Sequence, residues 1–160
     1  MDLLAYLAAS AFSQWLSLSI LGFPTLIALH SVGMGVVVGL SLIVTLHLWR
    51  ILPGLEDGLI PRLLDVALWG FLLNLGTGLG IFITRGPEYI ASYMFVLKMV
   101  LVVISATLLF RLRRRLKATE RMTGVPAPDR TARNLAVVST ATFLGAVVTG
   151  RLIAYLSDLY

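Results

Sequence analysis

Residues 88–117 read EYIASYMFVLKMVLVVISATLLFRLRRRLK, and this stretch decides the kind of fold. Residues 88–111 are mostly apolar, and a helix of about 20 such residues crosses the roughly 30 Å hydrocarbon core of a bilayer. The apolar run ends in five basic residues between positions 111 and 117. Lys and Arg residues that flank an apolar run are retained on the cytoplasmic side. We therefore predict a transmembrane helix over 88–111 whose carboxyl end faces the cytoplasm.

The composition of the whole chain agrees with that prediction. The 160 residues are 58% hydrophobic and only 13% charged, with a mean hydropathy of +0.92, whereas about a quarter of the residues in a soluble domain are charged. The net charge of +5 would suggest nucleic acid if it were spread out, but eight of the thirteen Lys and Arg residues lie within 111–133. One basic segment between apolar runs is a membrane topology signal, so we expect no nucleic-acid partner. The absence of cysteine excludes disulfides, thiolate metal sites and iron–sulfur clusters.

The six prolines separate the chain into further apolar runs. Each proline lies outside such a run or in its first turn, where the missing N–H does no harm. The predicted transmembrane helices are 24–50, 61–85, 88–111 and 132–157, each long enough to span the hydrocarbon. The fold class expected is therefore an all-α integral membrane protein, a single membrane domain over residues 1–160 that forms a four-transmembrane-helix bundle.

The connections between these runs set the predicted orientation. A tight connection at 85–88 joins the second and third spans, and residues 112–131 form a basic cytoplasmic loop. Since the ends of successive spans alternate, both chain termini are expected to be periplasmic.

Residues 2–21 are predicted to form an amphipathic interfacial helix that precedes the bundle. Polar side chains recur there at three- and four-residue intervals, from Asp2 and Tyr6 to Gln14 and Ser17. Such a stripe, with apolar residues on the other faces, is typical of a helix lying in the outer membrane interface. The alternative is an ordinary uncleaved span, which would place Asp2 inside the cell.

Polar residues inside the spans are the candidates for a functional site. An ionisable group near the middle of a bilayer costs about 2.5 to 3.5 kcal/mol, so each one needs a reason. His30 lies about 9 Å, and Lys98 about 15 Å, from the outer end of its span. Asn74 and Thr77 on the second span and Arg151 on the fourth also fall in the outer half. We predict a shared cofactor or ion site there, with unrelated interhelical hydrogen bonds as the alternative.

Two chemistries suit this site. A neutral His30 imidazole is a good axial ligand for the iron of haem b, with Lys98 and Arg151 placed to hold the propionates. Copper is the alternative cofactor, since Met34 lies on the face of His30 and Met94 on the face of Lys98, and imidazole and thioether ligands suit Cu(I).

The second histidine cannot share a metal with the first. His47 follows His30 by 17 residues, so on one helix the two side chains are about 25 Å apart. We expect His47 at the cytoplasmic interface near Asp65.

Three short motifs carry a resemblance. The run LSILGFPTLIALHSVGMGVVVG at 18–39, Gly76-Thr77-Gly78 and Phe95-Val-Leu-Lys98 resemble an uncharacterised family of small bacterial inner-membrane proteins. The wider pattern, an early His and a later Lys that starts a K-x-x-L run, is similar to the CopD copper-resistance and HemJ protoporphyrinogen-oxidase groups. In the HemJ-like group the His and Lys are tied to a b-type haem, which by resemblance maps onto His30 and Lys98. The chain departs from that pattern at residues 45–47, where Thr-Leu-His replaces an acidic residue and an Arg.

The function predicted is that of a small haem-binding protein or subunit of the bacterial inner membrane, acting in electron transfer. Its expected partners are the lipid bilayer and a larger respiratory or redox complex, or further copies of itself. A copper-binding or copper-transporting protein and a cofactor-free structural subunit are the alternatives. Enzymatic activity is left open, because the chain shows no nucleophile with a base.

Overall fold

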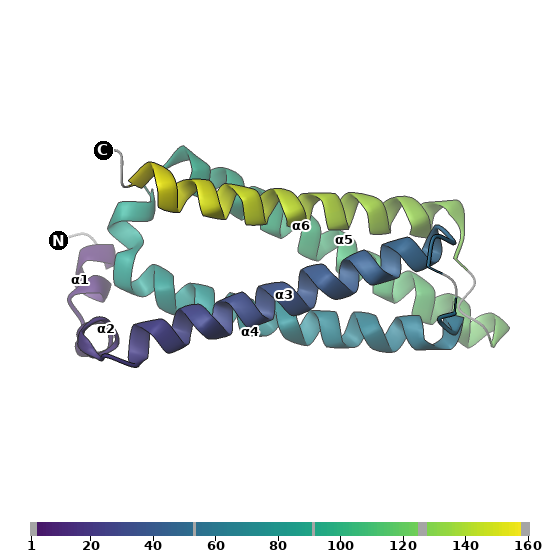
Figure 1. Ribbon diagram of the computed structural model, residues 1–160, viewed down its shortest axis with the longest axis horizontal. Coiled ribbons are helices and arrows are strands. Elements are labelled where there is room, and N and C mark those ends of the chain that lie inside the picture. Colours follow the sequence, from purple (N-terminus) through teal and green to yellow (C-terminus); the bar gives the residue numbers. More distant parts are fainter. Residues whose placement is uncertain (1–2, 53, 91, 125–127, 158–160) are drawn as a thin grey trace.

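The computed structural model describes residues 3–52, 54–90, 92–124 and 128–157, and these residues form helices and no strands. Two short helices precede a bundle of four long ones (Figure 1). In chain order the elements are α1 (Leu3–Ala8), α2 (Ala11–Leu18), α3 (Gly22–Leu48), the 3-10 turn η1 (Asp57–Leu59), α4 (Ile60–Ile90), α5 (Tyr93–Thr123) and α6 (Arg130–Ser157).

The four long helices are each long and apolar enough to cross a membrane. The mean hydropathy of their most apolar stretches is between 1.6 and 2.3, and no more than a third of the residues in each stretch are buried inside the bundle. Apolar side chains on an outer surface are what a hydrocarbon solvent requires. The prediction of an all-α fold with four such helices is confirmed.

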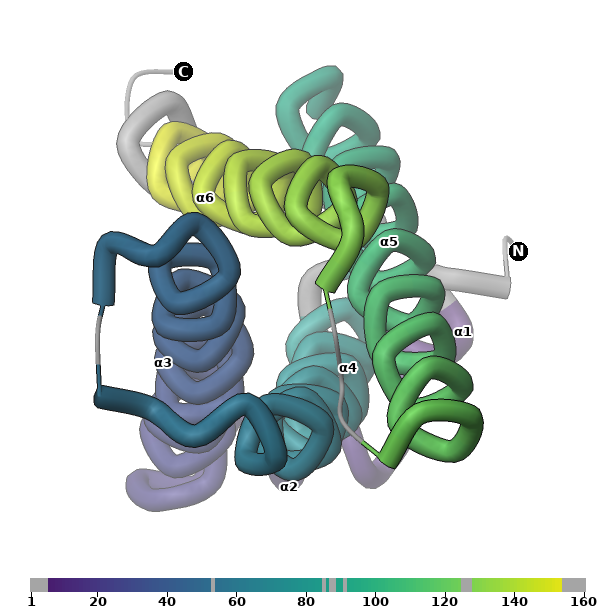
Figure 2. Tube along the Cα trace, turned by 90° about the vertical axis from the view of Figure 1, so that its right-hand side faces the viewer, coloured from purple at the N-terminus to yellow at the C-terminus, as the bar shows by residue number. Residues whose placement is uncertain are grey.

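The bundle consists of two helix hairpins. Helix α3 packs along α4, and α5 packs along α6, while contacts between the two pairs are fewer (Figure 2). A glycine lies at the closest approach of α3 and α4. A Cβ added to Gly33 would lie only 2.8 Å from the backbone oxygen of Gly70 and from the backbone nitrogen of Asn74. The backbones of α3 and α4 therefore touch at this point, as small residues allow in membrane helices.

The hydrophobic core occupies one half of the bundle. Its buried cluster begins at Val37 and Phe143, near the middle of α3 and α6, and runs toward the end where α3 finishes and α4 begins. Leu48, Leu64 and Leu112 in that half are each no more than 2% exposed. By the predicted topology this is the cytoplasmic half, so the two hairpins are held together mainly there.

The amino-terminal segment forms two helices instead of the single helix predicted over 2–21. Helix α2 begins at Ala11, after Ser10. The side-chain oxygen of Ser10 accepts a hydrogen bond from the N–H of Ser13 at 3.3 Å and so caps the new helix. Ser13 is buried, while Phe12 and Trp15 are 53% and 62% exposed. An outward apolar face is what an interfacial helix needs, and Asp2 lies outside the described residues.

The turn between the second and third spans is later than predicted. Helix α4 continues through 85–88 to Ile90, and α5 starts at Tyr93. Pro87 therefore lies inside α4, three residues before its end, and not in the predicted connection. A proline there removes one helical hydrogen bond and crowds the preceding turn. The Phe95 ring of α5 stacks on Phe82 and Tyr89 of α4, with centroids 5.5 and 5.6 Å apart. These contacts hold the two helices side by side up to the turn.

The basic segment 112–131 is mostly helical, which corrects its prediction as a loop. Helix α5 extends to Thr123 and ends at Gly124, whose left-handed conformation (φ 74°) forms a C-cap. Leu112 and Leu116 in this extension are each 1% exposed, so they anchor it to the core cluster. Helix α6 then begins at Arg130.

Candidate functional site

His30 lies in the amino-terminal half of α3, at the end of the bundle away from the core cluster, and its ring is held by a contact with α4. Its Nδ1 is 3.1 Å from Oγ1 of Thr77 on α4. That hydroxyl lies 2.7 Å from the carbonyl oxygen of Leu73 and 3.1 Å from that of Asn74. Its single hydrogen is donated to these carbonyls, so we assign it as the acceptor of a hydrogen bond from Nδ1. The pattern assigns the proton to Nδ1 and leaves the Nε2 lone pair available for a ligand.

Two more residues of α4 complete this setting. The Asn74 side chain donates from Nδ2 to the backbone oxygen of His30 at 2.7 Å. A Cβ added to Gly78 would lie 3.1 Å from Cε1 of the His30 ring, so the glycine leaves room for the imidazole against α4. The structure thus brings together three predicted site residues, His30, Asn74 and Thr77.

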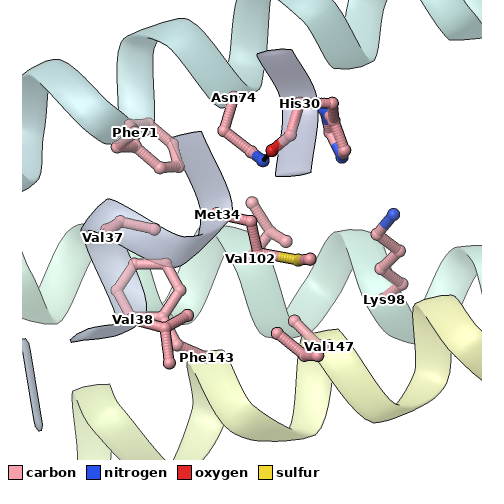
Figure 3. A pocket seen from close by; sticks show the side chains of 11 residues that line it. His30, Met34, Val37, Val38, Phe71, Asn74, Lys98, Val102, Phe143 and Val147 are labelled. Carbon is pink, nitrogen blue, oxygen red and sulfur yellow. Dashed lines mark hydrogen bonds between the residues drawn. The ribbon is translucent and has the colours of Figure 1, made fainter. Parts of the chain in front are cut away.

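Lys98 approaches the same place from the second hairpin. Its stem lies along α6, where a Cβ added to Gly150 would be 3.4 Å from Lys98 Cε and Nζ. The side chain reaches toward the His30 ring (Figure 3), and both residues line the same cavity. The imidazole of one hairpin and the cation of the other therefore share one site.

A small cavity separates the two hairpins at this level (Figure 3). His30, Met34, Asn74 and Lys98 line it together with apolar side chains such as that of Phe143. The space at its centre is about 30 Å³, which is room for one or two water molecules. Its polar groups are few and convergent, as in most ligand sites.

The site fits haem in its chemistry and does not fit it in its size. A free imidazole nitrogen suits iron, and an ammonium suits a propionate. A porphyrin is many times larger than the cavity, so the outer halves of the hairpins must separate before it can enter. That movement would leave the core cluster in place, since it lies in the other half. It would strain the ring contacts of Phe95 with Phe82 and Tyr89, which join α5 to α4 at this end of the bundle.

Two predicted ligands lie away from the cavity. Arg151 follows Gly150 on α6, but its side chain is exposed and does not line the cavity. Met94 lies one turn before Lys98 on α5 and is likewise outside the lining, whereas Met34 is part of it. Among the residues that the structure describes, no group of three or more His, Cys, Asp or Glu side chains could hold a metal ion.

A second polar cluster, which was not predicted from the sequence, lies at the end of the bundle where α3 finishes and α4 begins. His47 is 7% exposed, and its Nε2 bonds Oδ1 of Asp57 at 2.8 Å, so its partner is not the Asp65 that we expected. Asp65 instead accepts hydrogen bonds from Arg113 and, at 2.7 Å, from Lys117. The four-residue spacing of Arg113 and Lys117 on one helix face is the signal that could have indicated a shared acidic partner.

Comparison of the chain with family models, curated proteins and solved structures found no significant match. The likeness to the CopD and HemJ groups therefore rests on the motifs around His30, Thr77 and Lys98 alone, and it stays a prediction. What stands independently is an all-α chain with four helices suited to a membrane.

Proposed function

We propose that the protein is a multi-pass membrane protein that binds one haem b in the outer half of its bundle, through His30, and serves in electron transfer. The observation that carries this proposal is the Nδ1 hydrogen bond of His30 to Thr77. Axial histidines use such a bond to fix the tautomer and to orient the ring. When bound, the haem would supply a reversible one-electron couple.

Charge favours haem over a bare metal ion. Lys98 lines the same cavity as His30, and an ammonium repels a bare cation in a medium of low dielectric constant. It attracts the carboxylates of a haem. Lys98 would therefore hold a propionate, while Thr77 positions the ligand and Asn74 holds α4 against α3.

Copper is the second candidate, because Met34 and His30 line one cavity and offer thioether and imidazole ligands. The present cavity is large enough for a single ion.

Visible spectroscopy tests the proposal. The protein is expressed with ample haem supply, purified in detergent, and examined for a Soret band and for its reduced α-band. His30→Ala removes the Nε2 ligand and should abolish the bands. His47→Ala is the matched control, since His47 lies 17 residues further along α3, about 25 Å away, and bonds Asp57. This control should keep the spectrum.

Thr77→Val refines the test, because it removes the bond to Nδ1 and leaves the ligand atom in place. We expect haem affinity to fall about 10- to 100-fold while the bands persist at high haem concentration. Full haem content in His30→Ala, or equal loss in the two histidine variants, would contradict the proposal. Haem-free protein that carries copper, and loses it in Met34→Leu, would support the copper alternative.

A further inference from the structure

Three arginines form one outward stripe on the extension of α5. Arg111, Arg114 and Arg121 are three and seven residues apart, so they recur on one helix face over about 15 Å. At 100° per residue this face is opposite to the one that carries Leu112 and Leu116, which are buried in the core. The three side chains, here called the arginine stripe, are exposed.

The arginine stripe has no counter-charge within the part of the chain that the structure describes. The other basic side chains between 111 and 121 are paired: Arg113 and Lys117 with Asp65, and Arg115 with Asp129 at 2.9 Å. No described carboxylate oxygen lies within 4.0 Å of a stripe nitrogen. The acidic residues thus neutralise the inner and lateral faces of the extension and leave the outward face cationic.

The stripe begins where the lipid-facing surface of α5 ends. Val103 and Phe110, on the apolar part of the helix, are 64% and 46% exposed. The guanidinium of Arg114 lies 5.6 Å from the centroid of the Phe110 ring. The extension continues the axis of α5 along the bundle (Figure 1), so the stripe faces sideways, in the direction of the lipid headgroups.

We propose that the arginine stripe is a binding site for the phosphate groups of anionic phospholipids in the surrounding bilayer. Guanidinium groups bind phosphate oxygens in pairs of hydrogen bonds, and basic residues next to a membrane span attract anionic lipid. Continuity with the lipid-facing surface identifies the occupant as a membrane lipid. The site is independent of haem, since it lies at the opposite end of the bundle from His30.

Lipid titration tests this site. The full-length protein, purified in an uncharged detergent, is titrated with phosphatidylglycerol or phosphatidylcholine, and lipid binding is followed by native mass spectrometry and thermal unfolding. We expect phosphatidylglycerol to saturate at a concentration at least about tenfold lower than phosphatidylcholine. The triple variant R111Q/R114Q/R121Q should raise that concentration by roughly tenfold or more, because each basic residue contributes separately.

A charge-matched variant provides the control. R50Q/R62Q/R130Q removes the same charge from exposed positions at the same end of the bundle and should keep most of the phosphatidylglycerol affinity. R111K/R114K/R121K keeps the charge but loses the paired hydrogen bonds, so an intermediate affinity is expected. Without lipid, R111K/R114K/R121K should unfold at the wild-type temperature, which would show that the substitutions do not disturb folding.

Three outcomes would overturn the proposal. Equal loss of affinity in the stripe variant and in R50Q/R62Q/R130Q would mean that net charge, and not the stripe, attracts the lipid. Equal affinity for the two lipids would mean that the headgroup is not recognised. If millimolar inorganic phosphate displaces phosphatidylglycerol and stabilises the protein by the same amount, the occupant of the stripe would be a soluble anion.

Discussion

Single residues set the chemistry of the outer site through their hydrogen bonds. His30 has a free Nε2 because Nδ1 is engaged by Thr77, and Lys98 brings a cation from the other hairpin. His47 has the same side chain but bonds Asp57 and is buried in the other half of the bundle. Two identical residues on one helix therefore differ in hydrogen bonding and burial because of their neighbours.

The close contact at Gly33 leads to a prediction for a single substitution. Gly33→Ala places a methyl group 2.8 Å from two backbone atoms of α4, which cannot rotate away, so the hairpin must open. We expect a loss of about 1 to 3 kcal/mol of stability and a weaker His30–Asn74 contact, measured by thermal unfolding in detergent and by haem content. Gly35→Ala is the control, since no atom lies within 4 Å of its added Cβ. Equal destabilisation by the two changes would show that α3 and α4 do not touch at Gly33.

At the scale of elements, particular contacts fix the connection between α5 and α6. Helix α5 stops at Gly124, and α6 starts beyond Asp129, whose Oδ1 accepts from the N–H of Ala132 at 2.8 Å. Its Oδ2 accepts from Arg115 of α5 at 2.9 Å. A single carboxylate thus caps α6 and joins it to the extension of α5.

Asp129 predicts a dependence of stability on pH. The hydrogen bond from the Ala132 N–H, and then the positive charge of Arg115, lower the pKa of the Asp129 carboxyl below the ordinary value of 3.8. Its contribution is therefore present above that ordinary pKa and is lost as pH falls through the folded-state pKa. Asp129→Ala should lower stability by about 1 kcal/mol at pH 7, and the difference from wild type should shrink on acidification.

Thermal unfolding between pH 7 and pH 3 measures this effect. Asp129→Asn keeps a capping oxygen, so it should retain part of the stability at pH 7 without the pH dependence. A difference between wild type and Asp129→Ala that stays constant over this range would refute the role of the carboxylate.

The two ends of the whole molecule differ in how the hairpins pack: the core cluster fills one end, and a small cavity lies in the other half. The core cluster and the contacts of Asp65 with Arg113 and Lys117 join the two hairpins at the end where α5 finishes. At the other end the hairpins meet around the small cavity of His30 and Lys98. A ligand in the outer half would therefore act on the spacing of the hairpins.

The orientation of this molecule in the membrane follows from its basic end. Eight Lys and Arg residues within 111–133 predict that this end is cytoplasmic, and α5 and α6 run in opposite directions (Figure 1). Reporter fusions after Thr123 and after Tyr160 should report the cytoplasm and the outside, respectively. Reporters on the same side would rule out the four-span arrangement.

The sequence by itself determined the class of fold and the depth of the candidate residues. Lengths of apolar runs, prolines and clustered charges are local properties, so they predicted four membrane-type helices and placed His30, Lys98, Asn74 and Thr77 in one leaflet. Only the tertiary structure decided which of these side chains lie in one site, because that depends on how each helix is rotated about its axis. That rotation turned Arg151 outward and paired His47 with Asp57. It also decided that Leu112 and Leu116 of the basic segment are buried, since their place in the core cluster depends on long-range contacts.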